Sequence, residues 1–186
     1  MGARVTLWPV TPGDRHEFIA RARESVSLHR GLVFVPTTAA EFDEYLARFD
    51  GVAAIGFVVR LNTTKDLAGF VNINHIVWAP HRTGTLGYGG FTATAGHGYV
   101  AEAVRLAVRY AFDELGLYRL EADIQPGNAP SRKVVEQAGF RRTPSARHTI
   151  RIDGEWREHE RWMITTKMGS SRAFKYLESC TCHAKR

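Results

Sequence analysis

The sequence contains little cysteine, and the cysteine it has is gathered at one end. Its 186 residues include two cysteines, Cys180 and Cys182, which lie beside His183. The Cys-x-Cys-His arrangement offers three metal ligands, whereas a structural zinc site takes four ligands at other spacings. We therefore expect no metal site in this protein.

Long apolar runs and a strong charge on the globular part are also missing. No apolar run approaches the roughly 20 residues that cross a bilayer, and the first residues, MGARVTLWPV, lack the charged and apolar regions of a secretion signal. The formal net charge is +6, but the segment from Lys167 onward carries five lysines and arginines against one acid, which leaves +2 for residues 1–166. We expect a cytoplasmic protein that binds neither membranes nor nucleic acid.

The chain is long enough for one domain with a full hydrophobic core. We place this domain at residues 1–166, because no linker or repeat divides that range. Residues 167–186 follow the last expected strand and show no hydrophobic period. We expect this segment to be a disordered tail or a remnant of vector sequence.

The stretch from Thr85 to Leu115 is the most informative part of the chain. A short strand, Leu86–Phe91, leads into a turn of small residues, and a helix follows from Tyr99 to Leu115. The helix shows the i, i+3, i+4, i+7 spacing of one buried face. Its apolar positions are Val100, Ala103, Val104, Ala107, Val108, Ala111, Phe112 and Leu115.

The turn before this helix predicts an anion site. The first N–H groups of a helix have no partner within it, and together with the helix dipole they attract phosphate. Gly96 and Gly98 have no Cβ, so a bulky anion can approach the main chain closely. The turn is not a dinucleotide fingerprint, because its glycine pattern is incomplete, and it is not a P-loop, because no Gly-Lys-Ser/Thr follows.

The remaining segments predict a single α+β domain. Thr11–Asp14 and Thr38–Glu41 are typical helix starts, and Asp153-Gly154 predicts a tight hairpin. We expect irregular chain over Ser25–Pro36 and a loop over Pro80–Gly84. The other expected elements are strands at Val5–Trp8, Val52–Arg60, Leu67–Trp78 and Leu120–Ile124, a helix at Ser131–Ala138, a strand opened by Phe140, and strands at Arg147–Ile152 and Glu155–Thr165. The order β-αα-βββ-α-β-α-ββ predicts a mixed, mostly antiparallel sheet flanked by helices.

This order, with a glycine turn after the fourth strand, resembles the GNAT superfamily of N-acetyltransferases. The resemblance extends over Val5–Thr166 and is strongest to the ribosomal-protein-alanine acetyltransferases of the RimJ/RimL type. Each motif is short, and the likeness depends on their common order and spacing. The motifs are Leu86-Gly87-Tyr88, Gly96 to Ala103, Leu117 to Ala122, Pro126 to Ser131, Ala138-Gly139-Phe140 and Asp153 to Trp156.

The resemblance implies acetyl-CoA as the acetyl donor and a primary amine as the acceptor. The diphosphate of acetyl-CoA would bind the N–H groups of the glycine turn, and the pantetheine arm of acetyl-CoA would extend beside the strand that precedes the turn. Asn128 would hydrogen-bond this arm, and Ser131 would protonate the departing thiolate. The implied donor-binding residues are Tyr88, Gly90, Phe91, Gly96, His97, Gly98, Tyr99, Val100, Ala101 and Asn128.

The sequence departs from the family pattern near the expected phosphate site. Ala95 stands where the family usually has Arg or Gln, and Val100 replaces a small residue. One side-chain contact to phosphate is therefore missing, and His97 is a candidate to replace part of it. Gly89-Gly90 takes the place of larger residues and predicts a wider acetyl site.

An ammonium group must lose a proton before it attacks a thioester, so the reaction needs a general base. Glu121 is the first candidate, although a surface carboxylate paired with Arg119 or Arg141 is an equally good interpretation of it. Asp123, His148 and Glu160 are the alternatives. Asn72 and Asn74 share one face of a strand and could line the acceptor site.

The leading hypothesis is an acetyl-CoA-dependent N-acetyltransferase whose acceptor is a protein N-terminus or a small amine. The loss of Arg or Gln at position 95 motivates the alternative of a non-catalytic acyl-CoA-binding module with the same fold. The sequence is compatible with a homodimer, but no motif in it specifies one.

Overall fold

The computed structural model describes residues 2–169, with the side chains of 145–147 and 168–169 left aside. The predicted tail was placed at 167–186. Its first residues belong to a short terminal helix, and residues 170–186, including both cysteines, lie outside the described part.

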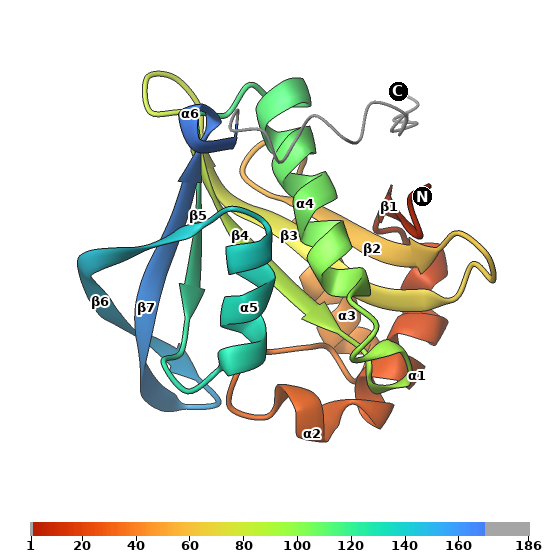
Figure 1. Ribbon diagram of the computed structural model, residues 1–186. Helices are drawn as coiled ribbons and strands as arrows, with labels where there is room; N and C mark the ends of the chain where they lie inside the picture. The colour runs from red at the N-terminus through yellow and green to blue at the C-terminus, as the bar shows by residue number, and fades with distance from the viewer. Residues whose placement is uncertain (1, 170–186) are drawn as a thin grey trace.

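Seven strands and six α-helices make up the described chain (Figure 1). The strands are β1 (Val5–Pro9), β2 (Ile55–Leu61), β3 (Leu67–Val77), β4 (Thr83–Gly90), β5 (Arg119–Ile124), β6 (Arg141–Ile152) and β7 (Glu155–Thr165). The helices are α1 (Arg15–Glu24), α2 (Val26–His29), α3 (Ala39–Ala47), α4 (Tyr99–Arg109), α5 (Ala129–Gln137) and α6 (Thr166–Gly169). Short 3-10 turns at Pro12–Asp14 and Thr92–Thr94 precede α1 and α4, and a π-helical turn at Tyr110–Glu114 follows α4.

The strands form one sheet in the order β1-β2-β3-β4-β5-β7-β6. Every neighbouring pair is antiparallel except β4 and β5, which run parallel. This confirms the predicted α+β fold with a mixed, mostly antiparallel sheet.

Each face of the sheet carries its own hydrophobic core. On one face, α4 and α5 pack their apolar sides against the central strands through residues such as Val104, Val108 and Val135 (Figure 1). On the other face, α1 and α3 enclose an aromatic cluster in which the Phe18 ring lies 5.3 Å from that of Phe42 and 5.4 Å from that of Phe91. The sheet is therefore covered on both sides around its centre.

Several boundaries differ from the sequence-based expectation; for example, β2 begins at Ile55 rather than Val52, and β6 runs without interruption from Arg141 to Ile152. Strand β4 begins at Thr83, inside the expected loop, because its first residues pair with β5. The long helix changes to a π-helical turn at Tyr110, where the N–H of Leu115 donates to the Tyr110 carbonyl, five residues earlier. The segment expected to be irregular contains α2.

Within residues 2–169, no helix is both long and apolar enough to cross a membrane. The same residues contain no group of three His, Cys, Asp or Glu side chains placed to hold a metal ion.

Candidate active site

A cleft opens where β4 and β5 separate. The two strands pair over three residues, from Thr83–Arg119 to Thr85–Glu121, and then diverge (Figure 1). The cleft between them has a volume of about 310 Å³. Its walls come from α2 and the chain after it, the second half of β4, the turn before α4, the end of β5, the start of α5 and His159 of β7. It is the place where the most elements converge, and most of the predicted site residues lie in it or beside it.

The turn before α4 presents a row of unused main-chain N–H groups. Within the described chain, no hydrogen bond leads from the N–H groups of Gly96 through Ala101 to another residue. Gly96 and Gly98 have φ values of +80° and +76°, a left-handed conformation that glycine adopts at little cost. Such a sequence of residues turns successive N–H groups toward one point and forms a concave anion site. The phosphate site predicted from the sequence stays a prediction, for which this turn has suitable geometry.

Arg4, just before β1, is tied to this turn, and sequence reasoning missed it. Its main-chain N–H and its Nε both donate to the carboxylate of Glu102, at 2.6 and 2.9 Å, and its Nη1 donates to the His97 carbonyl at 3.0 Å. The guanidinium also lies over the Tyr99 ring, 5.1 Å from its centre. A lone arginine before a first strand has no sequence signal that would connect it to a turn 90 residues away. The structure thus provides a cation beside the turn that lacks Arg or Gln at position 95.

His97 itself does not point freely toward the anion site. Its Nδ1 lies 2.9 Å from the Ala95 carbonyl, and its ring stacks on Tyr99 with the ring centres 5.5 Å apart. These contacts hold His97 and Tyr99 together on the outer side of the turn.

Tyr88 and Ser131 meet across the cleft. The Tyr88 hydroxyl lies 2.7 Å from Ser131 Oγ and donates to the Ser131 carbonyl at 3.0 Å. Because a carbonyl can only accept, both contacts are satisfied when the Ser131 hydroxyl donates to Tyr88. Burial raises the pKa of Tyr88 to about 12, so its hydroxyl keeps its proton at neutral pH. Because Ser131 Oγ contacts the Tyr88 hydroxyl, it is not used to cap α5.

Asn128 caps α5 instead. Its Oδ1 accepts a hydrogen bond from the Ser131 N–H at 3.1 Å. The Nδ2 group donates to no described residue, and Asn128 lines the cleft. One half of this side chain thus builds the helix, and the other half is available to a ligand.

Two expectations about the end of β4 are wrong. Phe91, assigned to the donor site, is fully buried in the aromatic cluster, and its N–H donates to the Ala68 carbonyl. The Gly89-Gly90 pair does not widen the site. A Cβ on Gly89 would lie 2.6 Å from the Phe70 ring, and one on Gly90 would lie 2.8 Å from Val100. These glycines are needed because neighbouring side chains occupy the space.

The predicted acceptor residues Asn72 and Asn74 are also placed elsewhere. Asn72 is 4% exposed, and its Oδ1 accepts a hydrogen bond from the Tyr45 hydroxyl at 2.8 Å. It therefore serves the core between β3 and α3. Neither asparagine belongs to the lining of the cleft.

Glu121, the first candidate for the general base, lies outside the cleft lining as well. Its two carboxylate oxygens pair with Arg119 at 3.0 Å and with Arg161 at 3.1 Å. Glu121 is therefore a carboxylate paired with arginines, as in the alternative interpretation. Its second partner is Arg161, whereas the sequence suggested Arg141. Glu121 is no longer a candidate for the base.

His29 of α2 also lines the cleft and is held in its neutral form. Its Nε2 donates to the Gly90 carbonyl at 2.8 Å, while Nδ1 is buried and has no partner among the described residues. Burial lowers the pKa of His29 below its usual value of 6.5, and the bond to Gly90 opposes this only in part. The ring fastens α2 to the end of β4.

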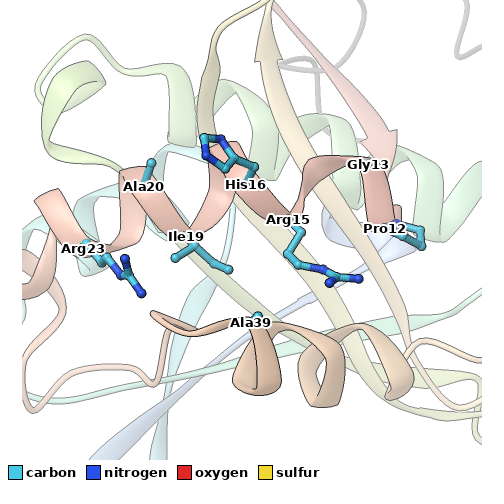
Figure 2. A pocket seen from close by; sticks show the side chains of 8 residues that line it. All are labelled: Pro12, Gly13, Arg15, His16, Ile19, Ala20, Arg23 and Ala39. Atoms are coloured by element: carbon cyan, nitrogen blue, oxygen red, sulfur yellow. The ribbon is translucent and has the colours of Figure 1, made fainter.

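A second hollow of about 520 Å³ lies between α1 and α3 (Figure 2). Its charged side chains are already engaged, because Arg15 pairs with Asp43 at 3.2 Å and Arg23 donates to the Thr37 carbonyl at 2.7 Å. The other side chains that line it carry no acid, hydroxyl or thiol. It is larger than the cleft but lacks converging chemical groups, so we place the site in the cleft.

Comparison with known proteins agrees with the fold. A family profile described as acetyltransferase (GNAT) domain matches residues 4–141. A probable N-acetyltransferase of Bacillus subtilis, YjcK, is 37% identical over 117 residues, which cover 63% of this chain and 65% of that protein. A ribosomal protein uS5-alanine N-acetyltransferase of Escherichia coli is 29% identical over 102 residues, or 55% and 53% of the two chains. The chain thus matches less than two thirds of the length of these curated relatives.

The fold is also found among solved structures. Mycobacterium smegmatis RimJ, solved in complex with CoA-disulfide, superposes with a TM-score of 0.76 over 88% of this chain and 82% of that one. The sequence identity is 21%, so this likeness concerns the fold.

We expect His29 to make stability depend on pH. Because its pKa is lowered in the folded state, the unfolded chain binds the proton first as the pH falls through 6.5. The unfolding free energy should therefore be insensitive to this group at higher pH and should decrease below that value. Replacing His29 by Gln should flatten this decrease in urea unfolding experiments between about pH 8 and about pH 5.5. His16→Gln, at an exposed histidine, is the matched control, and an unchanged pH dependence in His29→Gln would contradict the assignment.

Proposed function

The chain belongs to the family of GNAT acetyltransferase domains, and from this premise we propose that it transfers an acetyl group from acetyl-CoA to a primary amine. The observation that carries the proposal is the row of unpartnered N–H groups from Gly96 to Ala101 at the edge of the cleft. Acetyl-CoA supplies a diphosphate for this row and a thioester carbonyl that is open to attack by an amine.

The residues around the cleft fit such a donor. The main chain of β4 beyond Thr85 has no β5 neighbour, so an extended arm can lie along it in the manner of an added strand. Asn128 Nδ2 is available beside this edge, and the hydroxyl pair of Tyr88 and Ser131 lies in the same cleft. Arg4, although paired with Glu102, places guanidinium N–H groups next to Gly98, because its Nη2 lies 3.6 Å from the position that a Cβ would take there.

Two acceptor classes remain within this proposal. The similarity to a ribosomal protein uS5-alanine N-acetyltransferase favours a protein N-terminus, and a small amine is the alternative. A non-catalytic acyl-CoA-binding module is the alternative, motivated by the missing Arg or Gln at position 95.

The proposal is tested by measuring thiol release from acetyl-CoA in the presence of an acceptor panel. The panel should contain peptides with a free N-terminal alanine, serine or threonine, the same peptides with acetylated N-termini, and small polyamines. We expect release with at least one free amine and none with the blocked peptides. Saturable acetyl-CoA binding without release across the panel would instead identify a binding module.

We expect Gly98→Asp to weaken acetyl-CoA binding about 100-fold, because it removes roughly 3 kcal/mol of charge-assisted hydrogen bonds. The new carboxylate would compete with the diphosphate for the guanidinium N–H groups of Arg4 and repel it. Gly116→Asp is the matched control, because Gly116 also has a positive φ, of +65°, and open space around it but lies away from the turn. Equal affinities of Gly98→Asp and Gly116→Asp in titration calorimetry would refute this placement of the diphosphate.

We expect Ser131→Ala to lower kcat by about tenfold to a hundredfold, at or below the low end of general-acid effects because thiolate is a fair leaving group. Acetyl-CoA affinity should change little, because the Asn128 cap of α5 uses the main chain of Ser131. Tyr88→Phe keeps the ring but removes the hydroxyl that orients Ser131, so it should lose less than Ser131→Ala. Full activity of Ser131→Ala would remove Ser131 from the reaction.

A further inference from the structure

His159 lines the cleft, and neither the sequence nor the family match assigns it a role. It lies on β7 and is 3% exposed. Ile124, the last residue of β5, pairs with Glu160, so His159 stands immediately beyond the end of β5, where the cleft is open. Residues alternate between the faces of a strand, and His159 therefore shares a face with Arg161, whereas Glu160 shares the opposite face with Trp162.

The main chain selects which nitrogen of His159 carries the proton. Nδ1 lies 2.8 Å from the Arg157 carbonyl. A carbonyl can only accept a hydrogen bond, so Nδ1 is the N–H of the neutral ring and Nε2 holds the free lone pair. In the described chain, Nε2 makes no hydrogen bond to another residue. A neutral imidazole with one nitrogen fixed and the other open is the arrangement that general bases require.

The other titratable groups around His159 are already paired. Asp123 of β5 accepts hydrogen bonds from Arg161 at 3.0 and 3.3 Å, and its carboxylate lies 3.2 Å from Nε2 of His148 on β6. The His148 ring stacks beside that of His159, with the ring centres 6.2 Å apart. Across the cleft, His29 of α2 uses its Nε2 on the Gly90 carbonyl.

The remaining alternative, Glu160, faces away from His159. Its carboxylate accepts a hydrogen bond from Arg142 at 2.9 Å, and it does not line the cleft. Of the bases considered from the sequence, Asp123 is the single one in the cleft lining, and its carboxylate is bound to Arg161.

We propose that His159 is the general base that accepts a proton from the acceptor amine at Nε2. This inference rests on the proposed function. An acceptor ammonium has three N–H protons, and its amide product keeps one. As the nitrogen bonds to the acetyl carbon, the C–S bond breaks and its electron pair goes to sulfur. One proton passes to His159 and later to water. Ser131 gives its hydroxyl proton to the departing sulfur and takes up the second amine proton in its place.

His159→Gln tests the proposal because glutamine has similar size but no basic nitrogen. We expect kcat/KM for the acceptor to fall by about 10²- to 10⁴-fold near neutral pH, with acetyl-CoA affinity unchanged. The acidic limb of the wild-type pH profile of kcat/KM should disappear in this variant. His148→Gln is the matched control, because it alters the stacked neighbour, and it should keep both the limb and most of the rate.

A second measurement does not depend on turnover. Long-range ¹H–¹⁵N spectra of the histidine-labelled protein, assigned with His159→Gln, should show the neutral ring of His159 protonated at Nδ1, with no proton on Nε2. A ring protonated at Nε2 in its neutral form would overturn the proposal.

The kinetic outcomes separate this proposal from the proposed function. Wild-type turnover combined with an undiminished rate and an intact acidic limb in His159→Gln would overturn the role of His159 and leave the acetyltransferase assignment in place. Loss of the limb in His148→Gln, with the limb retained in His159→Gln, would move the base to His148. Absence of turnover in the wild type across the acceptor panel would overturn both proposals together.

Discussion

The separation of β4 from β5 is the constraint on which the rest of the site depends. Pairing ends at Thr85 and Glu121, and β5 continues along β7 instead. From that point the main chain of β4 has an open edge, and the helix that follows it begins beside the opening. A fully paired sheet would leave no cleft between these strands. A ligand bound by the unpartnered N–H groups before α4 would then have no cavity to occupy.

The cleft in the open sheet brings together two groups of residues, one on the side of the turn before α4 and one on the side of β5, β6 and β7. The turn before α4 and Arg4 lie at the end of the cleft where we propose that the diphosphate binds. His159, His148 and Asp123 lie along β5, β6 and β7, and His29 enters from α2. In the proposed reaction, the donor and the acceptor therefore use different walls of one cleft, and the thioester and the amine meet between them. The hydroxyl pair of Tyr88 and Ser131 stands on the wall shared by β4 and α5.

Local sequence signals predicted those parts of the molecule that depend on local chemistry. The capping box at Thr38 and Glu41 forms as expected, and Gly96 and Gly98 adopt the left-handed conformation that the turn requires. The start of β4 was missed because Thr83 and Gly84 have the composition of a turn and become a strand through pairing with a segment 36 residues later. Tertiary pairing overrides local preference there.

The candidate catalytic side chains depend on such distant pairings even more strongly. Whether Glu121 or His159 reaches the cleft is decided by the register among β5, β6 and β7, which no local pattern reveals. Asn72 looked like a polar lining residue because it alternates correctly along β3, but Tyr45 from α3 binds it in the core. The family resemblance correctly indicated the fold and the turn, whereas the individual side chains required the geometry.

The pairing of Arg4 with Glu102 has a consequence for how the cleft would respond to its surroundings. Because the two charges largely cancel, most of the attraction for a diphosphate must come from peptide N–H groups, which neither gain nor lose protons in the physiological range. Acid–base regulation would then act on the chemistry of the acceptor side and leave retention of the donor untouched. In the proposed reaction, acetyl-CoA would stay bound over a range of pH in which the rate of transfer changes.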